Sequence, residues 1–177
     1  MSEELDLMND ELNEIDDSQK GMFMTFQIAD ECYGIAITFV QEIVGIQSIT
    51  AVPEIEDYIK GLINIRGKII PVIDVRVRLK QAPREYTDRT CIIVIDVKST
   101  TVGLIVDEIA GVITVNEKEI ILPPSLSQSN SGNSKYVFGL ARVENEVKLL
   151  LDPEKLIRDE DVDALEDNAP AGEIAEA

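Results

Sequence analysis

Two acidic residues, Asp74 and Asp152, are the first candidates for chemistry in this sequence. They occupy equivalent places in two similar stretches 78 residues apart, and two like carboxylates can share a proton as an aspartic dyad does. Their neighbours do not support this role, because Val75-Arg76 and Pro153-Glu154 offer neither the glycine nor the small hydroxyl residue that would expose such a carboxylate. The chain has no histidine, no metal-ligand spacing and no glycine-rich phosphate loop, so catalysis is disfavoured.

Glu42 and Arg66 are candidates of another kind, because each is a charged residue that flanks apolar strands and has no packing task. Val40 and Glu42 alternate with Gln41, so both should point to the same side of a strand. Arg66 and Gly67 form the polar corner between two β-branched runs, where glycine allows the positive φ of a two-residue turn. The pattern predicts a β-hairpin with a charged residue at its tip.

The hairpin at residues 61–74 recurs later in the chain without a gap. A shift of 78 sets Gly61 on Gly139 and Asp74 on Asp152, and a shift of 66 sets residues 41–45 on 107–111. The second copy contains an additional Ser/Asn-rich loop near Ser129. Two copies indicate a duplicated β unit, since a solenoid needs three or more. We place the repeat halves at about residues 22–80 and 90–157, as two interleaved β-barrel subdomains.

Many short apolar runs predict a mainly β fold with few and short helices. Two small barrels are favoured because closure removes exposed strand edges. Residues 75–80 alternate apolar and basic side chains and also fit a strand, but their copy at residues 152–157 begins with an Asp cap followed by Pro. We therefore predict a short helix after both Asp74 and Asp152.

The charge is concentrated at the ends of the chain. Of the net charge of −18, residues 1–20 and 158–177 each contribute eight acids against one base, which leaves −4 for the middle. Both ends are predicted to be acidic flexible tails around one domain at residues 21–157. The middle has no basic stripe for nucleic acid. No apolar run is long enough to span a membrane, and the two cysteines, Cys32 and Cys91, are expected to be unpaired thiols in a reducing cytoplasm.

Several motifs together resemble the CheW family of chemotaxis coupling proteins. The resemblance extends from about Phe23 to Ile157 and is most specific in the central block. The motifs are Val40-Gln41-Glu42-Ile43, Gly61-Leu62-Ile63-Asn64-Ile65-Arg66-Gly67, Ile69-Ile70-Pro71-Val72-Ile73-Asp74, Gly139-Leu140 and Glu154-Lys155-Leu156-Ile157.

The resemblance implies two five-stranded SH3-like barrels, no enzymatic activity and no cofactor. It implies a cytoplasmic adaptor, recruited to receptor arrays at the inner face of the membrane without inserting into it. The adaptor would join the cytoplasmic tips of methyl-accepting chemotaxis receptors to the regulatory domain of the histidine kinase CheA. A paralogous scaffold of another receptor–kinase pathway is the alternative. CheV-type and CheA relatives would need modules that this length and the lack of histidine exclude.

Receptor-binding residues are also implied by the resemblance. Carried over by position, they are Val40, Glu42, Gly61, Asn64, Arg66, Cys91 and Val112. Kinase contacts would use an exposed apolar surface of the first barrel. Simpler roles remain open for three of the residues: a backbone bend for Gly61, a core position for Val40 and a solvated turn for Arg66.

Two structural expectations follow from these assignments. Glu42 and Arg66 should form an ion pair across the receptor groove. Gly61→Asp should weaken receptor binding by intruding on that groove while leaving the fold largely intact.

Overall fold

The computed structural model describes residues 20–122 and 135–157 as short strands with a few helical turns. The proposed acidic tails, apart from Lys20, and the Ser/Asn-rich loop lie outside the described residues. The strands are β1 (Met22–Ile28), β2 (Glu31–Ala36), β3 (Val40–Gly45), β4 (Ile59–Ile65), β5 (Lys68–Asp74), β6 (Cys91–Val97), β7 (Thr100–Val106), β8 (Glu108–Thr114), β9 (Val137–Val143) and β10 (Glu146–Leu151). The helical segments are η1 (Ile37–Phe39), α2 (Val75–Arg78), η2 (Glu117–Glu119) and α3 (Pro153–Leu156).

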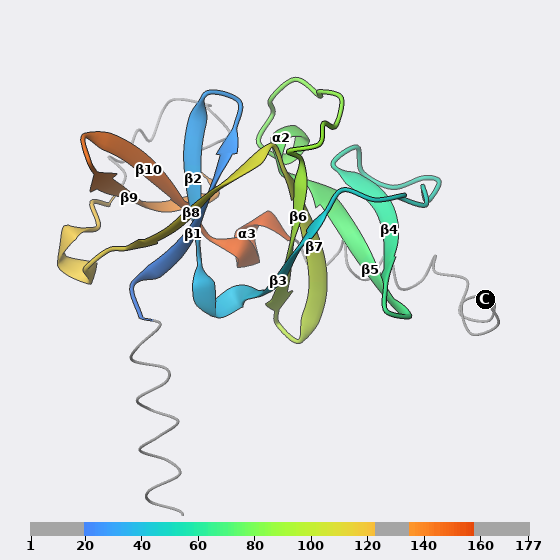
Figure 1. Cartoon of the computed structure of the whole chain (residues 1–177), viewed down its shortest axis with the longest axis horizontal. Helices are drawn as coiled ribbons and strands as arrows, with labels where there is room; N and C mark the ends of the chain where they lie inside the picture. The colour runs from blue at the N-terminus through green and yellow to red at the C-terminus, as the bar shows by residue number, and fades with distance from the viewer. Residues whose placement is uncertain (1–19, 123–134, 158–177) are drawn as a thin grey trace, which may run out of the picture.

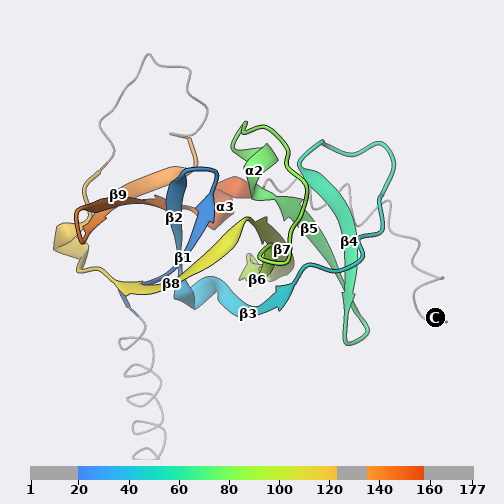
Figure 2. The same ribbon diagram turned by 45° about the horizontal axis from the view of Figure 1, so that its top comes forward.

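The strands form two five-stranded sheets, which confirms the predicted mainly β class. The first sheet has the order β8-β1-β2-β10-β9, and the second has the order β3-β6-β7-β5-β4. The two orders correspond position by position: β8 takes the place of β3, and the β9–β10 hairpin takes that of β4–β5. In Figures 1 and 2 the sheets lie side by side with α3 between them. The chain passes from the first sheet to the second after β2 and returns after β7.

Both repeated hairpins have the same two-residue turn. Arg66 and Gly67 have φ values of 51° and 83°, and Glu144 and Asn145 have φ values of 52° and 66°. Positive φ at both central positions is what a type I′ turn requires, and its twist matches that of the flanking strands. The Asn64 side chain supports the first turn, because its Oδ1 accepts a hydrogen bond from the Gly67 N–H at 2.8 Å.

The two short helices follow the hairpins as predicted. Asp74 caps α2 by accepting a hydrogen bond from the Val77 N–H, and Asp152 caps α3 by accepting one from the Glu154 N–H at 3.0 Å. The alternative of a strand at residues 75–80 is wrong. An aspartate that accepts hydrogen bonds from the first free backbone N–H groups stabilises a helix start by about 1 kcal/mol.

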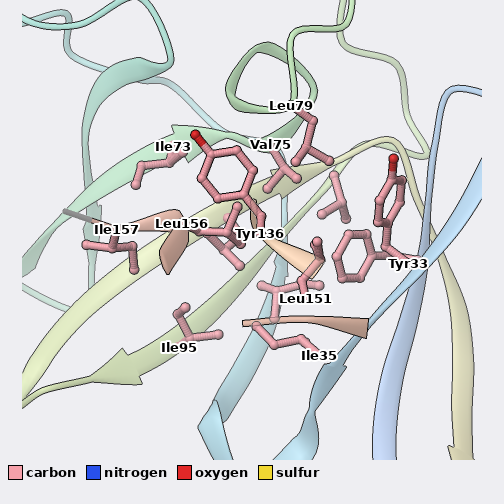
Figure 3. Close-up of a cluster of buried hydrophobic side chains, with 14 of the residues drawn as sticks. Tyr33, Ile35, Ile73, Val75, Leu79, Ile95, Tyr136, Leu151, Leu156 and Ile157 are labelled. Carbon is pink, nitrogen blue, oxygen red and sulfur yellow. The ribbon is translucent and has the colours of Figure 1, made fainter. Parts of the chain in front are cut away.

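Three groups of buried side chains hold the sheets together. One group lies within each sheet, and the largest lies between them (Figure 3). This central cluster includes Ile35 of β2, Ile95 of β6, Leu79 after α2, and Leu156 and Ile157 at α3, and they are all buried. Strand β6 contributes to two clusters, because Ile92 packs within the second sheet and Ile93 packs between the sheets. The two sheets are therefore joined by a continuous apolar core.

No helix in the described parts of the chain is long and apolar enough to cross a membrane. Cys32 and Cys91 are free thiols, Cys32 buried and Cys91 half-buried, as the sequence predicted.

Candidate functional site

The predicted ion pair between Glu42 and Arg66 is present. An Arg66 Nη2–H donates to Glu42 Oε1 over 2.5 Å. This hydrogen bond, and then the negative charge of Glu42, raise the pKa of Arg66 above its ordinary value. The partners lie on β3 and on the tip of the β4–β5 hairpin, and β3 and β4 are the two edges of the second sheet. The pair therefore bridges the edges of a sheet that curves back on itself.

Val40 and Glu42 do not share a face of β3, contrary to the prediction. Val40 is opposite Ile95 of β6, while Glu42 is opposite Val94, because the register shifts between Val40 and Glu42. Such a β-bulge places one extra residue, here Gln41, against the partner strand and reverses the alternation beyond it. Val40 therefore packs against the central cluster, whereas Glu42 lies opposite Val94, which belongs to the second sheet's own core.

Strands β3 and β8, together with the start of β6, carry apolar side chains that are half-buried or exposed. Figures 1 and 2 show β3 and β8 on the same side of the molecule. Val40, Cys91 and Ile109 are partly buried against the central cluster. Ile43 and Val112 are 39% and 46% exposed. We call these five residues the apolar face.

A second register shift brings Val112 of β8 onto this face. Ile109 is opposite Phe26 of β1, and Val112 is opposite Met24, so both follow the side of β1 that faces the central cluster. Without the shift, residues three apart would point to opposite sides of the strand. Burial, and then the charge of Glu108 at the start of β8, raise the pKa of the Cys91 thiol. Both sheets therefore contribute to the apolar face.

Gly61 has a backbone role, which is the simpler of the two roles that the sequence left open. It is buried, has a φ of 141°, and a Cβ built on it would lie 2.0 Å from the Thr50 carbonyl oxygen. Thr50 also exchanges two backbone hydrogen bonds with Leu62, which fixes the segment that covers Gly61. The expectation that Gly61→Asp leaves the fold intact is therefore wrong, because any side chain displaces backbone here.

The predicted site residues therefore fall into three groups. Glu42, Arg66 and Asn64 gather at the hairpin tip, where Asn64 supports the turn. Val40, Cys91 and Val112 belong to the apolar face, and Gly61 lies buried beneath Thr50. The assignment of all seven to receptor binding stays a prediction.

Two exposed apolar features were missed by the sequence reasoning. Ile43 lies within a predicted motif, and only the bulge before it turns it outward. The second feature comprises the exposed residues Ile121 and Leu122 beside β9 and Val147 on β10, which are 55%, 76% and 51% exposed. The Pro-Pro pair after Leu122 could have predicted the exposure of Ile121 and Leu122, because prolines mark the start of a loop and apolar residues next to a loop are poorly placed for burial.

The structure brings no catalytic pair together at the two aspartates. Asp74 accepts hydrogen bonds from Val77 N–H and from the Tyr86 hydroxyl at 3.0 Å, and Asp152 accepts from Glu154 N–H. Each aspartate therefore caps a helix. Asp74 does so at the end of β5 in the second sheet, and Asp152 does so after β10 of the first sheet. Within residues 20–122 and 135–157, no three potential metal ligands cluster. The arrangement is suited to binding protein surfaces.

Comparisons with known proteins agree with this architecture. The model of the CheW-like domain matches residues 22–161. The chain is 35% identical over 146 residues to chemotaxis protein CheW of Klebsiella aerogenes, covering 82% of this chain and 86% of that protein. It is 40% identical over 129 residues to chemotaxis protein CheW of Bacillus subtilis, covering 73% and 81%.

A solved structure gives the same result in three dimensions. The scaffolding protein TtCheW of Thermoanaerobacter tengcongensis superposes with a TM-score of 0.72 at 33% identity, covering 80% of this chain and 94% of that one. Matches of this extent include both sheets and the sequence that connects them. The chain therefore belongs to the CheW-like family of non-enzymatic chemotaxis scaffolding proteins.

Proposed function

We propose that this chain couples the cytoplasmic tips of methyl-accepting chemotaxis receptors to the regulatory domain of the histidine kinase CheA. The adaptor works in the cytoplasm, held by its partners at the inner face of the membrane. The observation that carries the proposal is the apolar face beside the Glu42–Arg66 pair, with Ile43 and Val112 exposed. An apolar patch with a charged rim is typical of a protein-binding surface.

The receptor is assigned to this face, and the kinase to other exposed apolar residues, which are Ile121 and Leu122 beside β9 and Val147 of β10. The two surfaces comprise different residues on different strands. A scaffold needs such separation, because one surface cannot hold two partners at once.

We expect a receptor tip fragment and the kinase regulatory domain to bind together. Transient interfaces bury about 1,200 Å² or less, so each contact alone should have a Kd near 1 μM. The measurement is sedimentation of the three-component mixture, with each pair as control. Competition between receptor and kinase for this chain would contradict the proposal.

The role of the ion pair can be tested by charge reversal. Glu42→Arg and Arg66→Glu should each weaken receptor binding, since Glu42 holds the Arg66 side chain at the edge of the face. Both should scarcely change the melting temperature, because exposed ion pairs contribute little to stability. Titration calorimetry measures the affinities of the two single variants and of the swapped double variant.

The receptor affinity of the charge-swapped double variant decides whether the two residues act as a pair. The double variant should recover part of the binding, because residues in contact show a coupling energy in a double-mutant cycle. Losses that simply add would mean that Glu42 and Arg66 act on the receptor independently.

A further inference from the structure

A polar cleft of about 400 Å³ lies next to the apolar face and has no part in the proposed function so far. Its lining residues come from the end of β1 and the turn after it (Gln27 and Ala29), from the segment at residues 84–90, and from Asp74 and Asp107. Thr90 and Glu108 line the cleft, and the residues that follow them, Cys91 and Ile109, belong to the apolar face. The cleft therefore continues the face at its polar end.

Two of the four acidic residues that line the cleft, Asp74 and Asp107, are already hydrogen-bonded. Asp107 accepts two hydrogen bonds from Arg76 and one from the Ala29 N–H at 2.9 Å. Burial acts to raise the pKa of Asp107, but the hydrogen bonds from Arg76 and Ala29 outweigh it and lower the pKa below its ordinary value. Asp74 accepts hydrogen bonds from the Tyr86 hydroxyl and from the Val77 N–H, through which it caps α2. These groups shape the cleft and have little capacity left for a ligand.

Two guanidinium groups at the cleft have unused donors. Arg84 lines the cleft and makes no hydrogen bond or ion pair with any described residue, and its charge helps to lower the pKa of Asp107. Arg89 is 73% exposed and approaches Glu108 only at 3.7 Å, which is too long for a hydrogen bond. Each guanidinium carries five N–H donors in a planar fork that matches a carboxylate. Glu85 also lines the cleft and makes no hydrogen bond or ion pair with a described residue, so two guanidinium groups lie beside one uncommitted carboxylate. The mouth of the cleft therefore keeps a net capacity to bind an anion.

We propose that Arg84 and Arg89 bind the carboxylate of an Asp or Glu side chain on the receptor segment that occupies the apolar face. This inference rests on the proposed function. A free small anion is disfavoured, because a chain with a net charge of −18 repels anions from solution. A carboxylate carried into place by apolar contacts overcomes that repulsion, since its local concentration is set by the partner. The contact at the cleft then sets the position of the receptor segment along the apolar face, which apolar contacts alone do not specify.

The test uses the full chain with both arginines replaced, Arg84→Gln and Arg89→Gln. Arg84 makes no hydrogen bond, and the pair of Arg89 with Glu108 is long and largely exposed, so the melting temperature should scarcely change. The affinity for a receptor tip fragment should fall at least tenfold, and it should depend less on salt, because two charged contacts are removed. Arg142→Gln is the matched control for each single variant, Arg84→Gln or Arg89→Gln, since Arg142 is an exposed arginine outside the cleft and each of the three changes removes one positive charge. It should change the affinity less than twofold.

A compensating pair identifies the carboxylate. Each Asp and Glu of the receptor fragment is changed in turn to Arg, and one of these variants should restore binding to Arg84→Glu. Unchanged affinity of the double Gln variant, with Glu42→Arg still defective, would overturn the cleft proposal and leave the proposed function standing. Failure of the unaltered chain to bind the receptor fragment would overturn both.

Inorganic phosphate distinguishes a partner's carboxylate from a small-ion site. Titration of the free protein, followed by NMR at the Arg84 and Arg89 side-chain N–H groups, should show no saturable binding with a Kd below about 1 mM. Saturable binding that Arg84→Gln abolishes would assign the cleft to a free anion and overturn the proposal.

Discussion

Gly61→Ala should destabilise this protein by about 3–5 kcal/mol, the larger end of what single substitutions do. The added Cβ would lie 2.0 Å from the Thr50 carbonyl oxygen and 2.7 Å from its carbon. The φ of 141° is also a conformation that side chains avoid. The melting temperature should fall by roughly 10 °C or more for a domain of this size. Thermal and urea unfolding measure the change.

Gly67→Ala provides the matched control. Gly67 also has positive φ, at 83°, but a Cβ there has nothing within 4 Å. It should cost only about 1–2 kcal/mol, the conformational penalty alone. Equal losses at the two glycines would show that the contact with Thr50 is unimportant. Receptor binding by Gly61 variants has to be interpreted against this loss of folded protein.

Asp107→Asn should cost about 2–4 kcal/mol, because it leaves the charge of Arg76 unpaired at a side chain that is 10% exposed. Asp107 joins β7 of the second sheet to β8 of the first, and its carboxylate also holds the Ala29 N–H in the β1–β2 turn. Its loss should therefore loosen the connection between the sheets. Urea unfolding at pH 7 measures the effect. Glu117→Gln, which removes an exposed pair with Lys20 at 3.8 Å, should change stability by less than about 1 kcal/mol.

The effect of Asp107→Asn should depend on pH in a defined direction. The folded state lowers the pKa of Asp107 below its value in the unfolded chain, which is about 3.9. Its contribution to stability is therefore complete above that unfolded value and is lost as the pH falls through the folded pKa. The difference between the two proteins should be constant from pH 7 to about pH 5 and should shrink toward pH 3. A difference that persists at pH 3 would show that packing, and not charge, is responsible.

Local features of this fold could be predicted from the sequence because their causes are local. Arg66-Gly67 specifies a two-residue turn, and Asp74 and Asp152 specify helix starts through the first free N–H groups. The repeat of 78 residues assigned the same structure to both copies. The Glu42–Arg66 pair was also predicted, although through the family resemblance, since the two residues lie on opposite edges of a sheet.

The site itself depended on features that no local pattern encodes. The bulge at Gln41 separates Val40 from Glu42, and its position is set by the pairing of β3 with β6. The crowding of Gly61 depends on Thr50, a residue from a segment that folds over β4. The cleft at Arg84 and Arg89 needs walls from both sheets.

The sequence by itself determined the duplicated β units, their turns and caps, and the family, because these follow from residue types at fixed short spacings. Only the tertiary structure decided which side each strand presents to solvent. It also decided which arginines form ion pairs and which do not. Strand register and the exchange of strands between sheets bring together residues that are far apart in the chain, such as Arg76 and Asp107.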